Sequence, residues 1–231
     1  AGRDYNAVDM SPRQLWEVYL PPFKAAVEAG AATFMNSFND INGIPVTGHR
    51  GLQRDILKGA WGFKGFVVSD WGSIGEMVAH GFVKDKRDAA RVAMRAGSDM
   101  DMESDAYRLH LGELVSGGQV EAALVDDAVR RVLRKKFELG LFEDPYRFSD
   151  ASREQAVLAR PEHRAAARDM ARKSIVLLKN DAVAVPWSRT PAPLLPLSPQ
   201  VRTIAFIGPL VKAVADNHGG WSINVPGVDY K

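Results

Sequence analysis

One carboxylate in this sequence stands where a parallel α/β fold places its catalytic side chains. Asp70 directly follows the strand expected over 66–69 and precedes Trp71. In a parallel barrel, functional groups lie where the strands end, at the C-terminal face. A carboxylate can attack or stabilise an oxocarbenium-like centre, and an indole can stack on the C–H face of a pyranose. The pair therefore predicts a sugar site. The alternative is that Asp70 caps the helix expected over residues 73–79, because Asp after a strand often does so.

Other kinds of site find little support in the sequence. It contains no cysteine, which excludes disulfides, thiolate nucleophiles and cysteine-ligated zinc. Its five histidines lack metal-ligand spacing such as His-x-x-x-His, so we expect no metal site. Gly208 and Pro209 follow an apolar run without the Gly-Lys-Ser/Thr of a phosphate loop, and we interpret them as a turn.

The residues around Asp70 belong to a repeated pattern. Three times a helix-like stretch runs into a glycine and then a short apolar strand with a polar end: Gly30 before 32–37, Gly65 before 66–70, and Gly97 before 98–102. Such alternation indicates parallel βα units. A closed (β/α)8 barrel needs about 250 residues. Three units therefore fit either a small doubly wound sheet or the last part of a barrel.

After the third strand the pattern becomes helical. We expect helices over 106–115 and 120–139, and interpret the late basic residues of the second as a solvated face. A further helix over 162–173 leads into the apolar run 174–180. We then expect an extended, proline-rich segment over 185–199 and a buried parallel strand over 203–209. A domain junction is predicted between about residues 145 and 175.

Composition limits the class of protein. The 231 residues are 46% hydrophobic and carry a net charge of +2. That balance argues against disorder and against nucleic-acid binding, which normally uses a clustered basic excess. No stretch approaches the ~20 apolar residues of a membrane span, so we expect no membrane partner. The sequence starts at Ala1 without a visible signal peptide, and we interpret it as an internal fragment of a longer protein.

Several motifs, in order along the chain, resemble the glycoside hydrolase family 3 β-glucosidases of the bacterial periplasmic type. The run 61–71, which contains Asp70, resembles the family's nucleophile segment. The resemblance covers nearly the whole chain. Its other matching segments are residues 2–11, 19–23, 97–102, 140–142 and 177–180, together with Met35 and the pair Asn42-Gly43.

This resemblance implies an α/β fold class and a division of the chain. Residues 1–145 would be the C-terminal part of a (β/α)8-like catalytic barrel. Residues 146–200 would form an interdomain helix and a proline-rich linker. Residues 201–231 would start a second domain, an α/β sandwich.

The resemblance also implies an activity, the retaining, exo-acting hydrolysis of terminal β-D-glucosyl residues through a covalent glycosyl-enzyme on Asp70. Trp71, Met35 and Asp4 would contact the substrate, a β-glucoside or oligosaccharide, and no cofactor would take part. A periplasmic or secreted location goes with this type. The alternatives are a β-xylosidase of the same family and a non-catalytic fragment. For Met35 alone, the alternative is a core position at a strand end.

The sequence departs from the family pattern in ways that affect the site. Phe38 stands where some members have a tyrosine, and a phenyl ring cannot donate a hydrogen bond to substrate. The general acid/base glutamate of two-domain members would lie beyond Lys231. Within the chain, Glu76 and Glu103 are the nearest substitutes, and we interpret both as structural.

Overall fold

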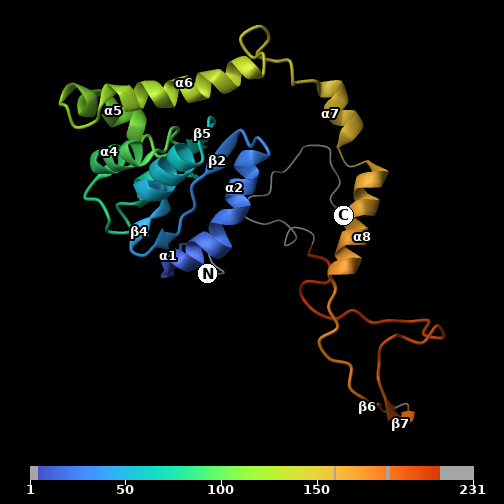
Figure 1. The fold of residues 1–231 in the computed structure, drawn as a ribbon. Helices are drawn as coiled ribbons and strands as arrows, with labels where there is room; N and C mark the ends of the chain where they lie inside the picture. The colour runs from blue at the N-terminus through green and yellow to red at the C-terminus, as the bar shows by residue number, and fades with distance from the viewer. Residues whose placement is uncertain (1–4, 159, 186–187, 214–231) are drawn as a thin grey trace. The chain divides into compact units, whose positions relative to one another are not determined.

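The computed structural model describes residues 5–158, 160–185 and 188–213. The chain divides into two compact units, residues 1–148 and 149–231, which are described separately (Figure 1). The first begins with three short elements and a helix: β1 (Ala7–Val8), α1 (Pro12–Gln14), the π-helix η1 (Leu15–Tyr19) and α2 (Leu20–Glu28). It continues through strands and helices that lead to the turn carrying Asp70.

Two predicted parallel strands form as expected. β2 (Thr33–Met35) pairs in parallel with β5 (Phe66–Val68), with Thr33 opposite Phe66 and Met35 opposite Val68. The π-helix η3 (Gly51–Ala60) lies between them in the sequence. This parallel arrangement directs the ends of both strands, and the residues that follow them, to the same edge of the sheet.

The third predicted strand, over 98–102, is reduced to a single parallel bridge between Val68 and Met100. Asp99 accounts for the interruption. Its Oδ2 accepts a hydrogen bond from Val67 N at 2.8 Å, and Asp99 N and Met100 N both donate to Val67 O. A side chain has therefore taken a place that a backbone carbonyl holds in a regular ladder.

A small sheet that the sequence reasoning did not predict lies beside these strands. β3 (Asp40–Ile41) pairs in parallel with β1 and antiparallel with β4 (Ile44–Pro45). Asn42 and Gly43 form the connecting turn, with φ of 51° and 79°. Two successive positive φ values are typical of a type I′ hairpin turn, which favours Asn-Gly. This dipeptide was the local signal for the hairpin. A 3-10 turn, η2 (Val46–Gly48), follows it.

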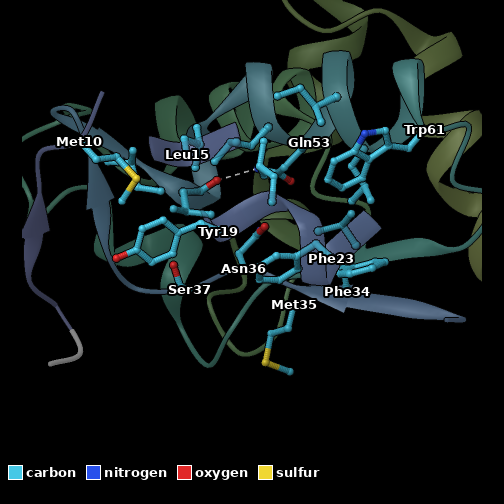
Figure 2. Close-up of a pocket in the computed structure, with 17 residues that line it drawn as sticks. Met10, Leu15, Tyr19, Phe23, Phe34, Met35, Asn36, Ser37, Gln53 and Trp61 are labelled. Carbon is cyan, nitrogen blue, oxygen red and sulfur yellow. Dashed lines mark hydrogen bonds between the residues drawn. The ribbon is translucent and has the colours of Figure 1, made fainter. Parts of the chain in front are cut away.

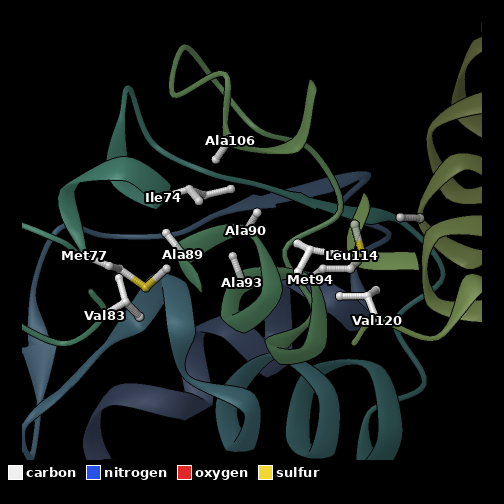
Figure 3. Close-up of a cluster of buried hydrophobic side chains, with 11 residues drawn as sticks. Ile74, Met77, Val83, Ala89, Ala90, Ala93, Met94, Ala106, Leu114 and Val120 are labelled. Carbon is white, nitrogen blue, oxygen red and sulfur yellow. The ribbon is translucent and has the colours of Figure 1, made fainter. Parts of the chain in front are cut away.

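The main core of the first unit lies among α3 (Ser73–Glu76), α4 (Lys86–Ala96) and α5 (Ala106–Ser116) (Figure 3). Asp85 caps α4 by accepting from Asp88 N at 2.8 Å, and Gly97, at φ 114°, ends it. Small side chains on α4 allow close packing, and burial of the apolar groups stabilises the arrangement. The buried members are Ile74, Met77, Val83, Ala89, Ala90, Ala93, Met94, Ala106, Leu114, Val120 and Ala128.

The long helix α6 (Ala122–Glu138) corrects one expectation about the basic residues. Arg131 is not on a solvated face, because only 15% of its side chain is exposed. Its Nη1 donates to Phe63 O and Gly65 O, both at 2.9 Å, and its Nε donates to Asp127 Oδ2 at 2.8 Å. This guanidinium satisfies carbonyls that precede β5, so the interpretation of the cluster as solvated was wrong for Arg131.

The second unit contains α7 (Ala151–Val157), α8 (Pro161–Ser174) and the antiparallel pair β6 (Val183–Val185) and β7 (Ser188–Ala192). The expected absence of regular structure over 185–199 was therefore wrong. A proline is tolerated in β7 because each strand of a two-stranded sheet has a free edge.

The strand expected over 203–209 is not formed either. The described part of the second unit offers this run no neighbouring strand, and Ile207 is 92% exposed. The apolar run 174–180 has no strand structure, and Leu178 is also 92% exposed. A parallel strand needs partners that supply hydrogen bonds and cover both faces.

Candidate active site

Asp70 lies where the sequence places it, on the turn that follows β5 and leads into α3. Its carboxylate Oδ1 accepts a hydrogen bond from Trp71 N at 2.7 Å. Gly72, at φ 73°, is the N-cap residue of α3, and no side chain caps that helix end. The interpretation of Asp70 as a helix cap is therefore wrong. The carboxylate is half-buried and engages the turn itself.

Residues 100–102 of the same chain hold the turn by hydrogen bonds. Ser69 N donates to Met100 O at 2.9 Å, and Gly72 N donates to Met102 O at 2.8 Å. The Ser69 hydroxyl accepts from Met102 N at 2.8 Å and donates to Asp70 O at 2.9 Å. These bonds lie on both sides of Asp70 and fix the backbone from which its carboxylate extends.

Trp71 and Met35 present large side chains to solvent. Trp71 is 53% exposed and Met35 is 54% exposed. The alternative that Met35 is a core residue is therefore wrong. Met35 is the last residue of β2 and lies opposite Val68 in β5. Asp70 follows Val68 by two residues, so Met35 and Asp70 extend from the same edge of the parallel pair. Asp4, the remaining predicted site residue, lies outside the described residues.

A cluster of aromatic and ionisable side chains packs near the turn, and the sequence did not predict it. Tyr5 stacks on Phe38 with ring centroids 4.5 Å apart, and its hydroxyl donates to Glu76 Oε1 at 3.4 Å. The ring of His80 lies edge-on to Tyr5, and its Nδ1 is 2.9 Å from Asp40 Oδ1. Phe38 is thus a packing partner of Tyr5. The cluster joins α3 to the small sheet.

The two glutamates considered as acids, Glu76 and Glu103, differ in their surroundings. Glu76 Oε2 is buried and has no hydrogen-bond partner among the described residues, while Oε1 accepts from Tyr5. A general acid must come within hydrogen-bond reach of the oxygen that it protonates. Glu103 is exposed on a turn with φ of 68°. The carboxylate of Asp101 bonds to the backbone, because its two oxygens accept hydrogen bonds from Ser104 N and Tyr107 N.

A cavity of about 250 Å³ opens beside this edge, between the N-terminal helices and η3 (Figure 2). Its lining is mostly apolar, with Tyr19, Phe23 and Trp61 among its members. Gln53 crosses its wall and donates to Val46 O at 2.8 Å. Met35 lines the cavity, but Asp70 and Trp71 do not, and the described lining contains no carboxylate.

A buried ion pair links η3 to the segment that follows α4. Lys58 Nζ lies 2.6 Å from Asp99 Oδ1 and also donates to Gly97 O at 2.7 Å. Burial lowers the pKa of Lys58 to about 8, although Asp99 opposes the shift; the neighbouring cations Arg54 and Arg131 add to the lowering. This pair supports the backbone that holds β5.

The described residues contain no group of three or more His, Asp or Glu side chains that could hold a metal ion. Among their helices, none combines the length and apolar character needed to cross a membrane.

Comparison with known proteins places this geometry in a family. A sequence model of the glycosyl hydrolase family 3 N terminal domain matches residues 1–135. The periplasmic beta-glucosidase of Salmonella typhimurium is 41% identical over 224 residues, which is 96% of this chain and 28% of that protein. A beta-xylosidase of Formosa agariphila is 37% identical over 87% of this chain and 28% of its own length.

The solved structures agree with the sequence relatives. A beta-glucosidase from Listeria innocua matches with a TM-score of 0.71 and 40% identity, over 78% of this chain and 25% of that one. The same enzyme in complex with glucose matches with a TM-score of 0.69. The chain thus spans 28% of the length of its Salmonella relative. Because the family model covers more than half of the residues and the relatives match nearly all of them, the chain belongs to glycosyl hydrolase family 3.

Proposed function

We propose that this chain is the nucleophile-bearing part of a retaining, exo-acting β-glucosidase that removes terminal β-D-glucosyl residues. One observation carries the proposal: Asp70 lies on the turn that follows β5, its carboxylate has no helix-capping role, and the exposed indole of Trp71 is next to it. Family membership and β-glucosidase relatives at about 40% identity support it. We use "parent enzyme" for the longer polypeptide that would carry this chain.

In the proposed mechanism, Asp70 forms a bond to the anomeric carbon while an acid from outside the chain protonates the departing glycosidic oxygen. Water then hydrolyses the covalent glycosyl-enzyme, and the anomeric configuration is retained. Such a mechanism needs the two carboxyl groups about 5–5.5 Å apart. Trp71 N holds Asp70 Oδ1, which leaves Oδ2 as the attacking oxygen.

The substrate-binding roles and the wider architecture belong to the same proposal. Trp71, Met35 and Asp4 would form part of the glucose subsite. The parallel strands β2 and β5 would belong to a (β/α)8-like barrel over 1–145, followed by a linker over 146–200 and a sandwich domain from 201. The name of the Salmonella relative supports a periplasmic location.

A β-xylosidase is the second candidate, since a Formosa relative with that name is 37% identical. A glucoside and a xyloside differ by the hydroxymethyl group on the sugar ring. The ratio of kcat/KM for an aryl β-glucoside to that for the matching aryl β-xyloside decides between them. A ratio below one would favour the xylosidase.

The nucleophile is tested by covalent trapping in the parent enzyme. A 2-deoxy-2-fluoroglucoside should label Asp70, and Asp70→Asn should lower kcat for an aryl β-glucoside by several orders of magnitude. Asp101→Asn is the matched control, because this carboxylate directly follows Met100, the bridge partner of β5, but bonds only backbone amides. Labelling of any carboxylate other than Asp70 would overturn the assignment.

A further inference from the structure

The hydroxyl group of Ser69 lies at the centre of the turn that carries the proposed nucleophile. Ser69 is fully buried and immediately precedes Asp70. Its Oγ accepts from Met102 N at 2.8 Å and donates to Asp70 O at 2.9 Å. The hydroxyl thus acts as donor and acceptor at once, and both partners are backbone groups at strand ends. It links the end of β5 to the segment at residues 100–102.

These bonds determine the orientation of one peptide group. The carbonyl of the Asp70–Trp71 peptide accepts from Ser69 Oγ and from Ser73 N, the latter at 3.1 Å. A peptide group is planar, so the direction of its carbonyl also sets the direction of its N–H. That N–H, on Trp71, holds Asp70 Oδ1 at 2.7 Å. The hydroxyl of Ser69 is therefore linked, through one rigid plane, to the orientation of the carboxylate.

We propose that Ser69 is a positioning residue for the nucleophile: its hydroxyl fixes the Asp70–Trp71 peptide plane, and the plane aims the carboxylate at the anomeric carbon. The inference rests on the proposed function, because it assigns a role relative to Asp70 as nucleophile. Ser69 itself does not contact the substrate. Loss of its hydroxyl should therefore slow the bond-forming step and leave sugar binding nearly unchanged.

The chain supplies a matched control in Ser98. This serine is also fully buried on the neighbouring chain segment, and its hydroxyl accepts from Asn36 Nδ2 at 2.7 Å. Its single proton is shared between two acceptors, Thr47 O at 3.1 Å and Gln53 Oε1 at 3.0 Å. None of these described partners belongs to the turn at residues 70–72. Ser98→Ala therefore removes a buried hydroxyl with at least as many hydrogen bonds, without releasing the nucleophile turn.

The experiment compares Ser69→Ala and Ser98→Ala in the parent enzyme, with an activated 2-deoxy-2-fluoroglucoside as the probe. The rate constant of inactivation measures formation of the glycosyl-enzyme, and competition by glucose measures sugar binding. Ser69→Ala should lower the inactivation rate constant roughly 10–100-fold, since small misplacements of reacting groups have effects of this size. Its glucose affinity should stay within about twofold. Ser98→Ala should change neither quantity by more than about threefold below its melting temperature.

The possible outcomes separate this inference from the proposed function. Peptide mapping of the labelled wild-type enzyme tests whether Asp70 is the nucleophile. Given a label on Asp70, equal inactivation rate constants for wild type and Ser69→Ala would overturn the positioning role, and so would equal losses in the two alanine variants. If Ser69→Ala does not fold, Ser69→Cys decides, because the thiol keeps a side-chain atom at the γ position but is a weak donor and acceptor. A wild-type rate constant in Ser69→Cys would then contradict the proposal.

Discussion

The ion pair of Lys58 and Asp99 shows how single residues support the site from a distance. The side chains of Lys58 and Asp99 are only 5% and 1% exposed. Lys58 on η3 reaches Gly97 O after α4, while Asp99 reaches Val67 N in β5. The carboxylate of Asp99 thus replaces part of a strand ladder. The two charges stabilise each other because both are buried away from water.

Replacing the lysine alone should be costly. Lys58→Met leaves the Asp99 carboxylate buried without its cation, and we expect the free energy of unfolding to fall by about 3–5 kcal/mol. Urea denaturation followed by circular dichroism measures the change. The double variant Lys58→Met, Asp99→Asn removes both charges but keeps an acceptor for Val67 N, and should recover part of the loss. No recovery would mean that the charge of Asp99 is not the cause.

The lowered pKa of Lys58 also predicts a pH dependence. With a folded pKa of about 8 against an unfolded value near 10.4, the unfolded chain binds more protons between these limits. The free energy of unfolding therefore rises with pH through this group, between about pH 8 and 10. The difference in the free energy of unfolding between wild type and Lys58→Met should be larger at about pH 9.5 than at about pH 7. A difference that shrinks over this range would contradict the assigned shift.

The exposed indole of Trp71 leads to a prediction about binding rather than stability. Trp71→Ala in the parent enzyme should weaken the transition-state complex with an aryl β-glucoside by on the order of 1–3 kcal/mol, by analogy with base–aromatic stacking. Because the ring is 53% exposed, the melting temperature should change little. Steady-state kinetics and a thermal melt measure the two quantities. Normal kcat/KM with a much lower melting temperature would show a packing role instead.

At the scale of elements, the approach of β2 to β5 depends on a missing side chain. A Cβ on Gly65 would lie 2.0 Å from Ala32 O and 2.8 Å from Ala32 C, both backbone atoms at the start of β2. The two strands can begin this close together only with glycine there. The polypeptide cannot relieve such an overlap by rotating a side chain.

Gly65→Ala should therefore separate the starts of the strands. We expect a loss of about 3 kcal/mol or more in the free energy of unfolding, at the upper end of overpacking effects. The control is Gly112→Ala in α5, where a Cβ meets nothing within 4 Å and should stabilise the helix by about 0.5–1 kcal/mol. Urea denaturation of both variants tests the prediction. Equal small effects would show that β2 can shift without cost.

The sequence predicted elements whose signals are local and missed those that depend on distant contacts. Glycine followed by an apolar run correctly predicted β2 and β5. The same signal failed at 98–102 because Asp99 turns its carboxylate onto β5, which no local pattern indicates. The run 203–209 has the composition of a buried strand but lacks neighbours within the described chain.

The candidate site divides in the same way. The strand-end position predicted Asp70 and Trp71 as neighbours, whereas Met35 and Asp4 came only from the family resemblance, and their binding roles stay predictions. The contact of Tyr5 with Glu76 joins residues 71 positions apart, so sequence spacing could not reveal it. The positioning bonds of Ser69 likewise depend on residues 100–102.

At the scale of the whole molecule, the 231-residue chain carries the nucleophile candidate, and the proposed mechanism takes its acid from outside the chain. Glu76 has one buried oxygen and one occupied by Tyr5. We therefore expect the isolated chain not to hydrolyse cellobiose, since general acid catalysis is worth about 10²–10⁴-fold. An activated aryl glucoside, whose leaving group needs little protonation, could show a trace of turnover. Purified chain assayed with both substrates tests this, and cellobiose turnover abolished by Glu76→Gln would identify Glu76 as an acid.

The guanidinium of Arg131 also has a consequence for the order in which the molecule is made. The carbonyls of Phe63 and Gly65 accept from a residue that lies more than sixty positions later in the chain. A ribosome adds about 5–20 residues per second, so several seconds pass between synthesis of these carbonyls and synthesis of their donor. During that interval water must occupy both acceptors. The segment that carries Asp70 can therefore reach its final hydrogen bonding only after α6 has left the ribosome.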